Sequence, residues 1–254
     1  MIVANTDNVL EKEKRSVEKF HERQVDGLII ATARRLDNLV ETCLEEGTPL
    51  VLAVRSTINK DVNSVVSDEI AGGQMIVSHL AQLGHKKIAY VAGPQFLSTG
   101  FERYQGYLQG LKNEGLKVDK DLVAIGDAFT EEEGRRAASM IRANRKPFTA
   151  IVAGNDLMAL GCYDELIAKG LRCPDDLSVV GYDDMPFTRH FNPPLTTVHT
   201  PLLDVGMQAA YILLEKIWKP EQPTHALKLQ PHLIVRGSTS TPSTYSETNT
   251  KYSN

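Results

Sequence analysis

Two adjacent carboxylates follow an apolar run in the last third of the chain. Val180-Gly181-Tyr182 leads directly into Asp183 and Asp184, and an extended segment, LTTV, begins eleven residues later. A buried parallel strand delivers an acidic residue to the rim of an α/β sheet in this way, and ligands of open α/β sheets bind at that rim. Asp183 could therefore accept hydrogen bonds from two neighbouring sugar hydroxyls. Capping of a loop or helix is the alternative, and it is the commoner use of Asp.

The same carboxylate pair also allows an enzyme, because Asp183 and Asp184 could bind Mg²⁺ or act in acid–base catalysis. The motifs that would support catalysis are missing. The sequence contains no GxxxxGK[ST], no GxGxxG after a strand, no GxSxG and no HExxH, and its seven histidines show no metal-ligand spacing. We therefore expect a protein that is not an enzyme and has neither a cofactor nor a metal site.

Two further polar residues stand at expected helix starts. Arg103 follows Gly100 and could offer its fork of N–H donors to ligand oxygens. Asn155 follows a strand end. Its amide can both donate and accept hydrogen bonds, which suits a ligand hydroxyl because that group is itself donor and acceptor. The alternatives are a solvated Arg in the first turn of a helix and, beside Asn155, a helix capped by Asp156.

Phe129 and Asp68 complete the set of candidate ligand-binding residues. Phe129 comes just before a predicted helix cap and could stack on the apolar face of a sugar or base. Its alternative role is a hydrophobic staple. Asp68 ends a strand where the chain could cross between domains, and it either faces a cleft or caps the helix that starts near Ala71.

Short apolar runs that alternate with helical periodicity must position these residues. The strand-like runs cover 28–31, 50–54, 65–66, 88–91, 122–125, 150–153, 177–180 and 227–235, and Thr130 with Glu133 has the spacing of a capping box that opens a helix to Ile141. This alternation predicts parallel sheets with right-handed crossovers. Since the units are too many for one small sheet, we predict an α/β protein of two doubly wound lobes with a cleft between them.

Composition excludes several classes of protein. The 254 residues are 42% hydrophobic and carry a net charge of −4 without a basic stripe, which argues against this chain alone gripping nucleic acid by its phosphates. The three cysteines are scattered and form no CxxC pair, so zinc ligation and a disulfide framework are not expected and a reducing cytosol suits the chain. We expect neither a secretory signal nor a membrane span.

The chain resembles the effector-binding core of the LacI/GalR family of bacterial transcription regulators from about Ile2 to Ser238. Six segments in a characteristic order and spacing carry this resemblance: QVDGLII at 24–30, HL at 79–80 with GHKKI at 84–88, Arg103 with GY at 106–107, NDLMALG at 155–161, VGYDD at 180–184, and PLTTV at 194–198. The resemblance implies two lobes like those of periplasmic sugar-binding proteins, joined by three crossings. A sugar, nucleobase or related metabolite would bind between the lobes of a cytoplasmic, side-by-side homodimer.

On this resemblance the N-terminal lobe comprises 1–67 and 201–226, the C-terminal lobe comprises 68–200 and 227–237, and 238–254 form a disordered tail. Arg103 and Asp183 fall on principal ligand contacts of the family. Asn155 matches a position that hydrogen-bonds sugar in some members, and Phe129 matches a ring that stacks on ligand in some. Asp68 falls at the first crossing, where Glu69 replaces the Asn that usually follows it.

The N-terminal lobe is expected to be incomplete. Ile2–Thr6 resembles the second strand of that lobe, so the helix-turn-helix headpiece, the hinge and the first strand–helix unit would be absent. DNA would then be bound only through a headpiece that this chain lacks. Because a missing central strand leaves backbone groups unpaired, at about 1–3 kcal/mol each, we expect this lobe to be rearranged, completed by a partner or unstable.

The favoured hypothesis is therefore the ligand-sensing core of a LacI-type regulator. A transport-type sugar-binding protein would use the same lobes but needs a signal peptide, and the regulator-like segment 155–161 decides against it. The α/β enzyme that uses Asp183 and Asp184 is the third hypothesis.

Overall fold

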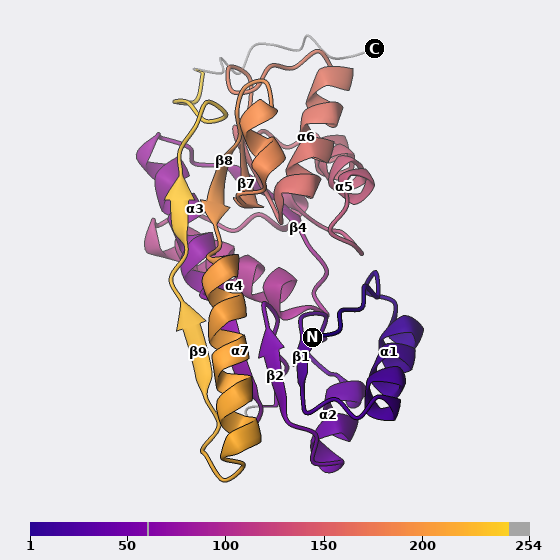
Figure 1. Ribbon diagram of the computed structural model, residues 1–254. Helices are drawn as coiled ribbons and strands as arrows, with labels where there is room; N and C mark the ends of the chain where they lie inside the picture. The colour runs from indigo at the N-terminus through magenta and orange to yellow at the C-terminus, as the bar shows by residue number, and fades with distance from the viewer. Residues whose placement is uncertain (60, 244–254) are drawn as a thin grey trace. The chain divides into compact units, whose positions relative to one another are not determined.

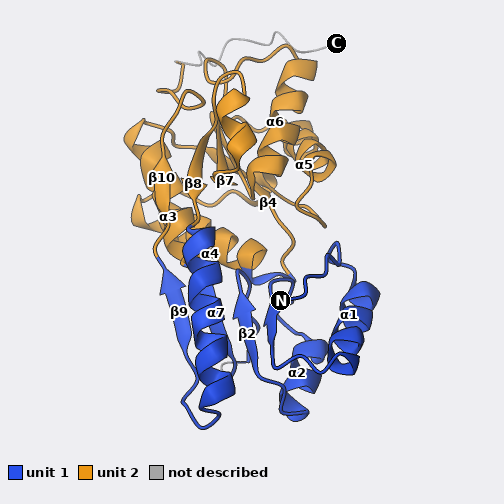
Figure 2. Ribbon diagram, viewed as in Figure 1, with its two compact units in different colours: residues 1–67, 96–98, 201–229 blue, residues 68–95, 99–200, 230–254 orange. Residues whose placement is uncertain are grey.

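The computed structural model describes residues 1–59 and 61–243, which divide into two compact units (Figure 2). Unit 1 contains 1–67, 96–98 and 201–229, and unit 2 contains 68–95, 99–200 and the residues after Leu229. The sequence-based boundaries had placed 96–98 and 227–229 in the C-terminal lobe. Strand pairing explains the second difference, because Leu227 pairs with Val65 in a parallel ladder of unit 1.

Unit 1 is a parallel sheet with helices on both faces (Figure 1). The sheet has the order β1-β2-β3-β9, with β1 at Leu28–Ile30, β2 at Leu50–Ala53, β3 at Asn63–Ser67 and β9 at Ala226–Leu229. The helices are α1 at Leu10–Glu22, α2 at Asn38–Glu45 and α7 at Leu202–Trp218. Because side chains alternate along a strand, Leu52 of β2 packs in the core beneath α1 and α2, whereas Val51 packs in the core with α7.

The expected strand at Ile2–Thr6 is wrong. These residues form no strand, and Ile2 and Val3 are exposed. A strand needs a hydrogen-bonding neighbour, and within the described chain β1 pairs only with β2. Extended segments without such a neighbour remain irregular even when their composition favours a strand.

Helix α7 is apolar on two opposite sides. Val205, Ala209 and Ile212 are buried against the sheet of unit 1. The opposite side carries large hydrophobic residues three or four positions apart that stay exposed: Leu203, Met207, Tyr211, Leu214 and Trp218. Helices that are apolar all round are normally buried. This exposed stripe of α7 faces away from the sheet of unit 1.

Unit 2 is a six-stranded sheet covered by two pairs of helices. Its strands are β4 at Ile88–Ala92, β5 at Val123–Ile125, β6 at Ala150–Ala153, β7 at Ser178–Asp183, β8 at Thr196–His199 and β10 at His232–Ile234, in the order β10-β8-β7-β6-β4-β5. All pairs are parallel except β8 with the edge strand β10. The helices are α3 at Glu69–Gln82, α4 at Ser98–Asn113, α5 at Glu131–Ala143 and α6 at Asp156–Ala168, and the 3₁₀ turns η1 and η2 cover Lys120–Leu122 and Pro186–His190.

The two faces of this sheet have separate cores, one with α5 and α6 and one with α3 and α4. Helix α5 begins where the capping box predicted, because Thr130 Oγ1 accepts a hydrogen bond from the backbone N–H of Glu133. Helices α5 and α6 approach closely at two glycines. A Cβ at Gly134 would lie 2.2 Å from the carbonyl oxygen of Met158, and a Cβ at Gly161 would lie 2.0 Å from that of Glu131.

The predicted disordered tail, 238–254, begins too early in the chain. Ser238 is fully buried. Its Oγ donates to the carbonyl oxygen of Val179 at 2.6 Å and accepts from the backbone N–H of Thr196 at 2.7 Å. Seryl hydroxyls replace missing strand partners here, so a Ser- and Thr-rich composition does not mark the end of the fold. Residues 244–254 of the predicted tail lie outside the described residues.

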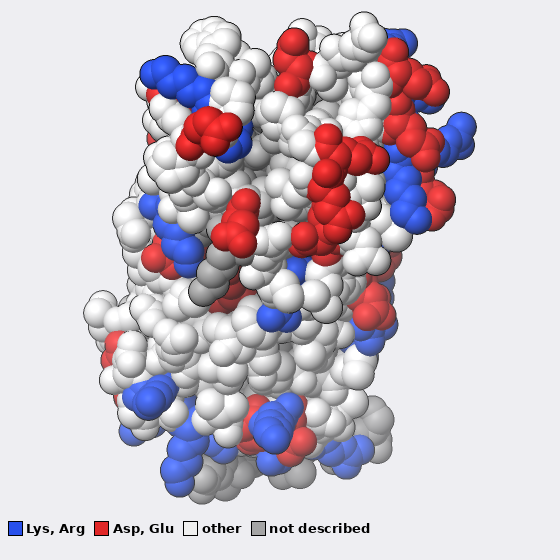
Figure 3. All heavy atoms as spheres, turned by 90° about the horizontal axis from the view of Figure 1, so that it is seen from below, with Lys and Arg blue, Asp and Glu red and all other residues white. Residues whose placement is uncertain are grey.

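Surface charge is mixed in sign. On the face shown in Figure 3, Lys and Arg side chains are interspersed with Asp and Glu. Among the helices of the described chain, none is both long and apolar enough to span a bilayer.

The close contact of α5 and α6 predicts the cost of a single methyl group. We expect Gly161→Ala to lower the free energy of unfolding by about 1–3 kcal/mol, because the added Cβ meets backbone that cannot move away. Gly206→Ala is the matched control, since a Cβ there meets no atom within 4 Å and lies in helix α7, where Ala is favoured over Gly by about 1 kcal/mol. Urea unfolding of both variants measures the difference. Equal stability of the two would contradict the close contact.

The edge position of β1 and the exposed residues before it predict local instability in the N-terminal part of unit 1. In limited proteolysis of the purified chain, we expect cuts within residues 1–67 before any within β4 to β7. Mass spectrometry of the early fragments locates the cuts. A monomer whose N-terminal residues resist the protease as long as unit 2 does would refute this expectation.

Candidate ligand-binding site

Arg103 lies at the centre of the candidate site, in the second turn of α4, and it is only 5% exposed. Its Nε donates to Glu69 Oε2 at 2.7 Å, and its Nη1 donates to the carbonyl oxygen of Gly154 at 2.8 Å. Its Nη2 donates to Asp183 Oδ1, also at 2.8 Å. One guanidinium thus joins the start of α3, the loop after β6 and the end of β7, all within unit 2.

Two aromatic rings accompany this guanidinium. The Cζ atom of Arg103 lies 3.8 Å from the ring centroid of Tyr182 and 5.7 Å from that of Phe129. Both distances are within the range of a cation–π interaction. Phe129 also lies against Gly93, where a Cβ would come within 2.2 Å of its ring. Phe129 is therefore held beside Arg103, in addition to packing on the core of α5 and α6.

Burial and ion pairing set the protonation of this group. Desolvation opposes the charge of Arg103, but the carboxylates of Asp183 and Glu69 outweigh it and raise the pKa of the guanidinium well above its ordinary value. Burial raises the pKa of Glu69, and the adjacent guanidinium of Arg103 works against that rise. The Asp183 side chain is 23% exposed and that of Arg103 only 6%, so Asp183 is the charged group presented at the surface.

The backbone at the two carboxylates is unusual. Asp183 has φ of 107° and Asp184 has φ of 53°, in the region that favours glycine. Such conformations cost about 1–3 kcal/mol each and cluster at ligand-binding sites. Asp184 has other partners than Asp183, which bonds to Arg103. Asp184 accepts a hydrogen bond from the guanidinium of Arg236, and its Oδ2 lies 3.0 Å from Nδ1 of His199. Among the described residues, no three His, Cys, Asp or Glu side chains form a group that could hold a metal ion.

Asn155 and Asp68 cap helices. Asn155 Oδ1 accepts from the backbone N–H of Met158 at 2.9 Å and so starts α6, the role that the sequence analysis gave to Asp156. Asp68 Oδ1 accepts from the backbone N–H of Ala71 at 3.0 Å, which is the capping alternative. Its neighbour Glu69 bonds to Arg103 instead. The only sequence signal for Glu69 was that it replaces the Asn usual in the family.

Asp156 is fully buried and was not predicted as part of the site. Its Oδ1 accepts from Thr197 Oγ1 at 2.7 Å, and its Oδ2 accepts from the backbone N–H of Met185 at 2.8 Å. Gly181 makes room for it, because a Cβ there would lie 2.3 Å from Oδ1. Burial raises the pKa of Asp156 to about 7, against the effect of its two hydrogen bonds. This carboxyl fixes the loop after Asp183 to β8.

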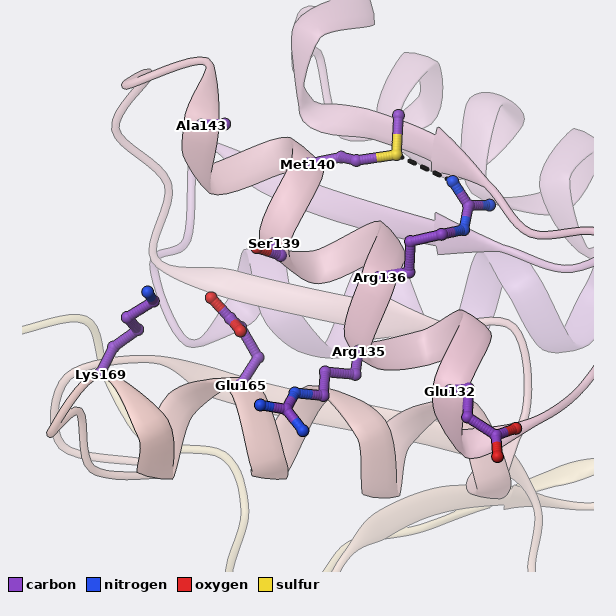
Figure 4. A pocket seen from close by; sticks show the side chains of 8 residues that line it. All are labelled: Glu132, Arg135, Arg136, Ser139, Met140, Ala143, Glu165 and Lys169. Atoms are coloured by element: carbon purple, nitrogen blue, oxygen red, sulfur yellow. Dashed lines mark hydrogen bonds between the residues drawn. The ribbon is translucent and has the colours of Figure 1, made fainter.

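A separate hollow lies along α5 and α6 (Figure 4) and contains none of the predicted ligand-binding residues. Its volume is about 630 Å³, and it is lined by Glu132, Arg135, Arg136, Ser139, Met140, Ala143, Glu165 and Lys169. Glu165 Oε1 is buried without a hydrogen bond and lies 3.7 Å from Nε of Arg142. This hollow lies on helices α5 and α6, away from the strand ends at which Arg103, Asp183 and Phe129 converge.

Comparison with known proteins identifies a family and relatives for this chain. Residues 77–239 match the family described as periplasmic binding protein-like domain. The HTH-type transcriptional repressor PurR of Pasteurella multocida is 31% identical over 239 residues, which are 94% of this chain and 71% of the relative.

Solved structures show the same fold. A transcriptional regulator CelR–cellobiose complex has a TM-score of 0.85 at 34% identity and covers 91% of this chain and 71% of that one. A LacI family transcriptional regulator from Enterococcus faecium with bound ribose has a TM-score of 0.79 at 26% identity, with coverage of 95% and 88%.

The raised pKa of Asp156 predicts how stability changes with pH. The folded protein keeps a proton on this carboxyl up to about pH 7, whereas the unfolded chain releases it near 3.8. The stabilisation is therefore complete below 3.8 and is lost as the pH rises to about 7. Asp156→Asn imitates the protonated form, since its amide can donate to Thr197 and its carbonyl can accept from Met185. We expect the variant to gain on the wild type by up to about 4 kcal/mol across this interval.

Urea unfolding followed by circular dichroism between pH 4.5 and 7.5 checks this expectation. Parallel pH profiles for the wild type and Asp156→Asn would show that Asp156 ionises at its ordinary pKa.

Proposed function

The chain belongs to the LacI/GalR family of bacterial transcription regulators, and on this premise we propose that Arg103, Asp183, Asn155 and Phe129 bind its small-molecule effector. The chain is the ligand-sensing part of such a regulator. The observation that carries the site is the buried Arg103, which fixes Asp183 at the end of β7 with its carboxylate still partly exposed.

The arrangement suits a polyhydroxyl ligand. The carboxylate of Asp183 is held in place before the ligand arrives, so binding does not have to order it. Neighbouring hydroxyls of a sugar can donate to it, while the ring of Phe129 offers a face for the apolar side of the sugar or for a base. Arg103 positions Asp183, and the guanidinium N–H groups that make none of these three bonds can donate to ligand oxygens. Asn155 and Asp68 also start α6 and α3 through their side-chain oxygens.

The ligands of similar proteins support this class of effector. One similar structure contains cellobiose and another contains ribose. An effector controls DNA binding only if its affinity differs between two conformations of the regulator, because equal affinity shifts no equilibrium. A repressor relative of 31% identity favours a regulator over a transport-type binding protein. The resemblance also leads us to propose a cytoplasmic homodimer, which size-exclusion chromatography with light scattering would detect.

Asp183→Ala tests the assignment of the pocket. A thermal-shift screen with cellobiose, ribose and the common nucleobases identifies a ligand by the rise in melting temperature that binding to the folded state causes. For the ligand found, we expect Asp183→Ala to weaken affinity about 10- to 100-fold, since hydrogen bonds to a charged group contribute about 1.5–3 kcal/mol. Glu69 still neutralises Arg103 in this variant, so the site should remain folded.

Asp204→Ala serves as the matched control, because Asp204 is an exposed carboxylate on α7. Calorimetric titration of the three proteins gives the affinities. Unchanged affinity in Asp183→Ala would remove Asp183 from the pocket.

A further inference from the structure

Two histidines face each other at the edge of the unit 2 sheet. His199 ends β8, His232 begins β10, and the two residues are directly paired in the antiparallel ladder. Their ring centroids lie 4.7 Å apart, with the ring planes inclined by 42°. Directly opposed residues of an antiparallel pair project from the same face of the sheet. Both imidazoles therefore stand side by side on one face.

A carboxylate orients the first of these rings. Oδ2 of Asp184 lies 3.0 Å from Nδ1 of His199, and the other oxygen of Asp184 accepts from the guanidinium of Arg236. Because an ionised carboxylate only accepts hydrogen bonds, Nδ1 carries the hydrogen and Nε2 of the neutral ring keeps its lone pair. Metal-bound histidines almost always donate their second nitrogen to such a carboxylate or carbonyl, which orients the ring and raises its basicity.

The pair is open to solvent while its support is buried. The His199 side chain is 39% exposed and His232 is exposed, whereas the Asp184 side chain is only 8% exposed. Among the described strands, β10 is the edge of this sheet and pairs with β8 alone. An aqueous ion could reach both rings without any rearrangement of the fold.

We propose that His199 and His232 form a two-histidine site for a transition-metal ion of the Cu²⁺, Ni²⁺ or Zn²⁺ class. Imidazole nitrogen is the ligand type that these ions share. The described residues supply no third His, Cys, Asp or Glu to complete a group. Water therefore fills the remaining coordination positions, and the ion exchanges readily.

Such an ion would close a loop of the chain. Residues 200–231 separate the two histidines and include all of α7 and β9, which belong to unit 1. The folded chain holds the two rings side by side, whereas in the unfolded chain these 32 residues separate them. Bound metal therefore stabilises the pairing of β8 with β10 by mass action.

Titration of the untagged chain with CuSO₄ tests the site. By calorimetry and electron paramagnetic resonance, we expect one Cu²⁺ bound with two imidazole nitrogens in the wild type. His199→Ala and His232→Ala should each weaken this binding at least ten-fold. His225→Ala is the matched control, since His225 is exposed and its contact to Asn63 uses only the backbone N–H. It should bind Cu²⁺ like the wild type.

Asp184→Asn tests the supporting carboxylate separately. We expect about a 10- to 100-fold loss of Cu²⁺ affinity, with both nitrogens still in the spectrum of the saturated protein. Thermal unfolding shows which variants fold. If Asp184→Asn does not fold, the variants His199→Ala and His232→Ala still test the site, because both replaced side chains are at least partly exposed. Wild-type affinity in His199→Ala or His232→Ala, or a loss in His225→Ala, would overturn the proposal.

Discussion

A single buried guanidinium connects parts of unit 2 that are far apart in the sequence. Arg103 bonds to Glu69 at the start of α3, to the carbonyl of Gly154 after β6 and to Asp183 at the end of β7. A charge at this depth is tolerated only while it is paired, and removal of one partner from a buried pair typically costs about 3–5 kcal/mol. The geometry of Asp183 therefore follows from the packing of α3 and α4 as much as from β7 itself.

Much of the architecture could be predicted from local patterns. The alternation of apolar runs with helical periodicity predicted most strands of both units, because burial on both faces of a parallel sheet leaves continuous apolar segments. The single run expected at 227–235 is instead two strands, β9 in unit 1 and β10 in unit 2. The spacing of Thr130 and Glu133 predicted the start of α5. The resemblance to known regulators predicted Arg103 and Asp183 as ligand contacts, and the two side chains are hydrogen-bonded to each other. Ile2–Thr6 shows the limit of such patterns, because a strand also depends on a neighbour that its own residues do not encode.

The remaining parts of the site depend on distant packing. Glu69 is 34 residues from Arg103 in the sequence, and only the contact of α3 with α4 brings their charges together. Asp156 has a favourable capping position, yet the absence of a side chain at Gly181 opens a buried place for it against β8. Neither contact leaves a local signal, because each joins residues that are far apart in the sequence.

The burial of Ser238 between β7 and β8 has a consequence for the order of synthesis. The chain leaves unit 2 after Thr200, builds α7 and β9 in unit 1, and returns to complete the earlier sheet with β10 and Ser238. Domains generally acquire structure while they emerge from the ribosome. Here the sheet of unit 2 is completed only after all of unit 1 is translated, because β10 and Ser238 follow Leu229 in the sequence. A nascent chain that stalls before this point leaves the backbone groups of Val179, Thr196 and β8 that bond to Ser238 and β10 without these partners.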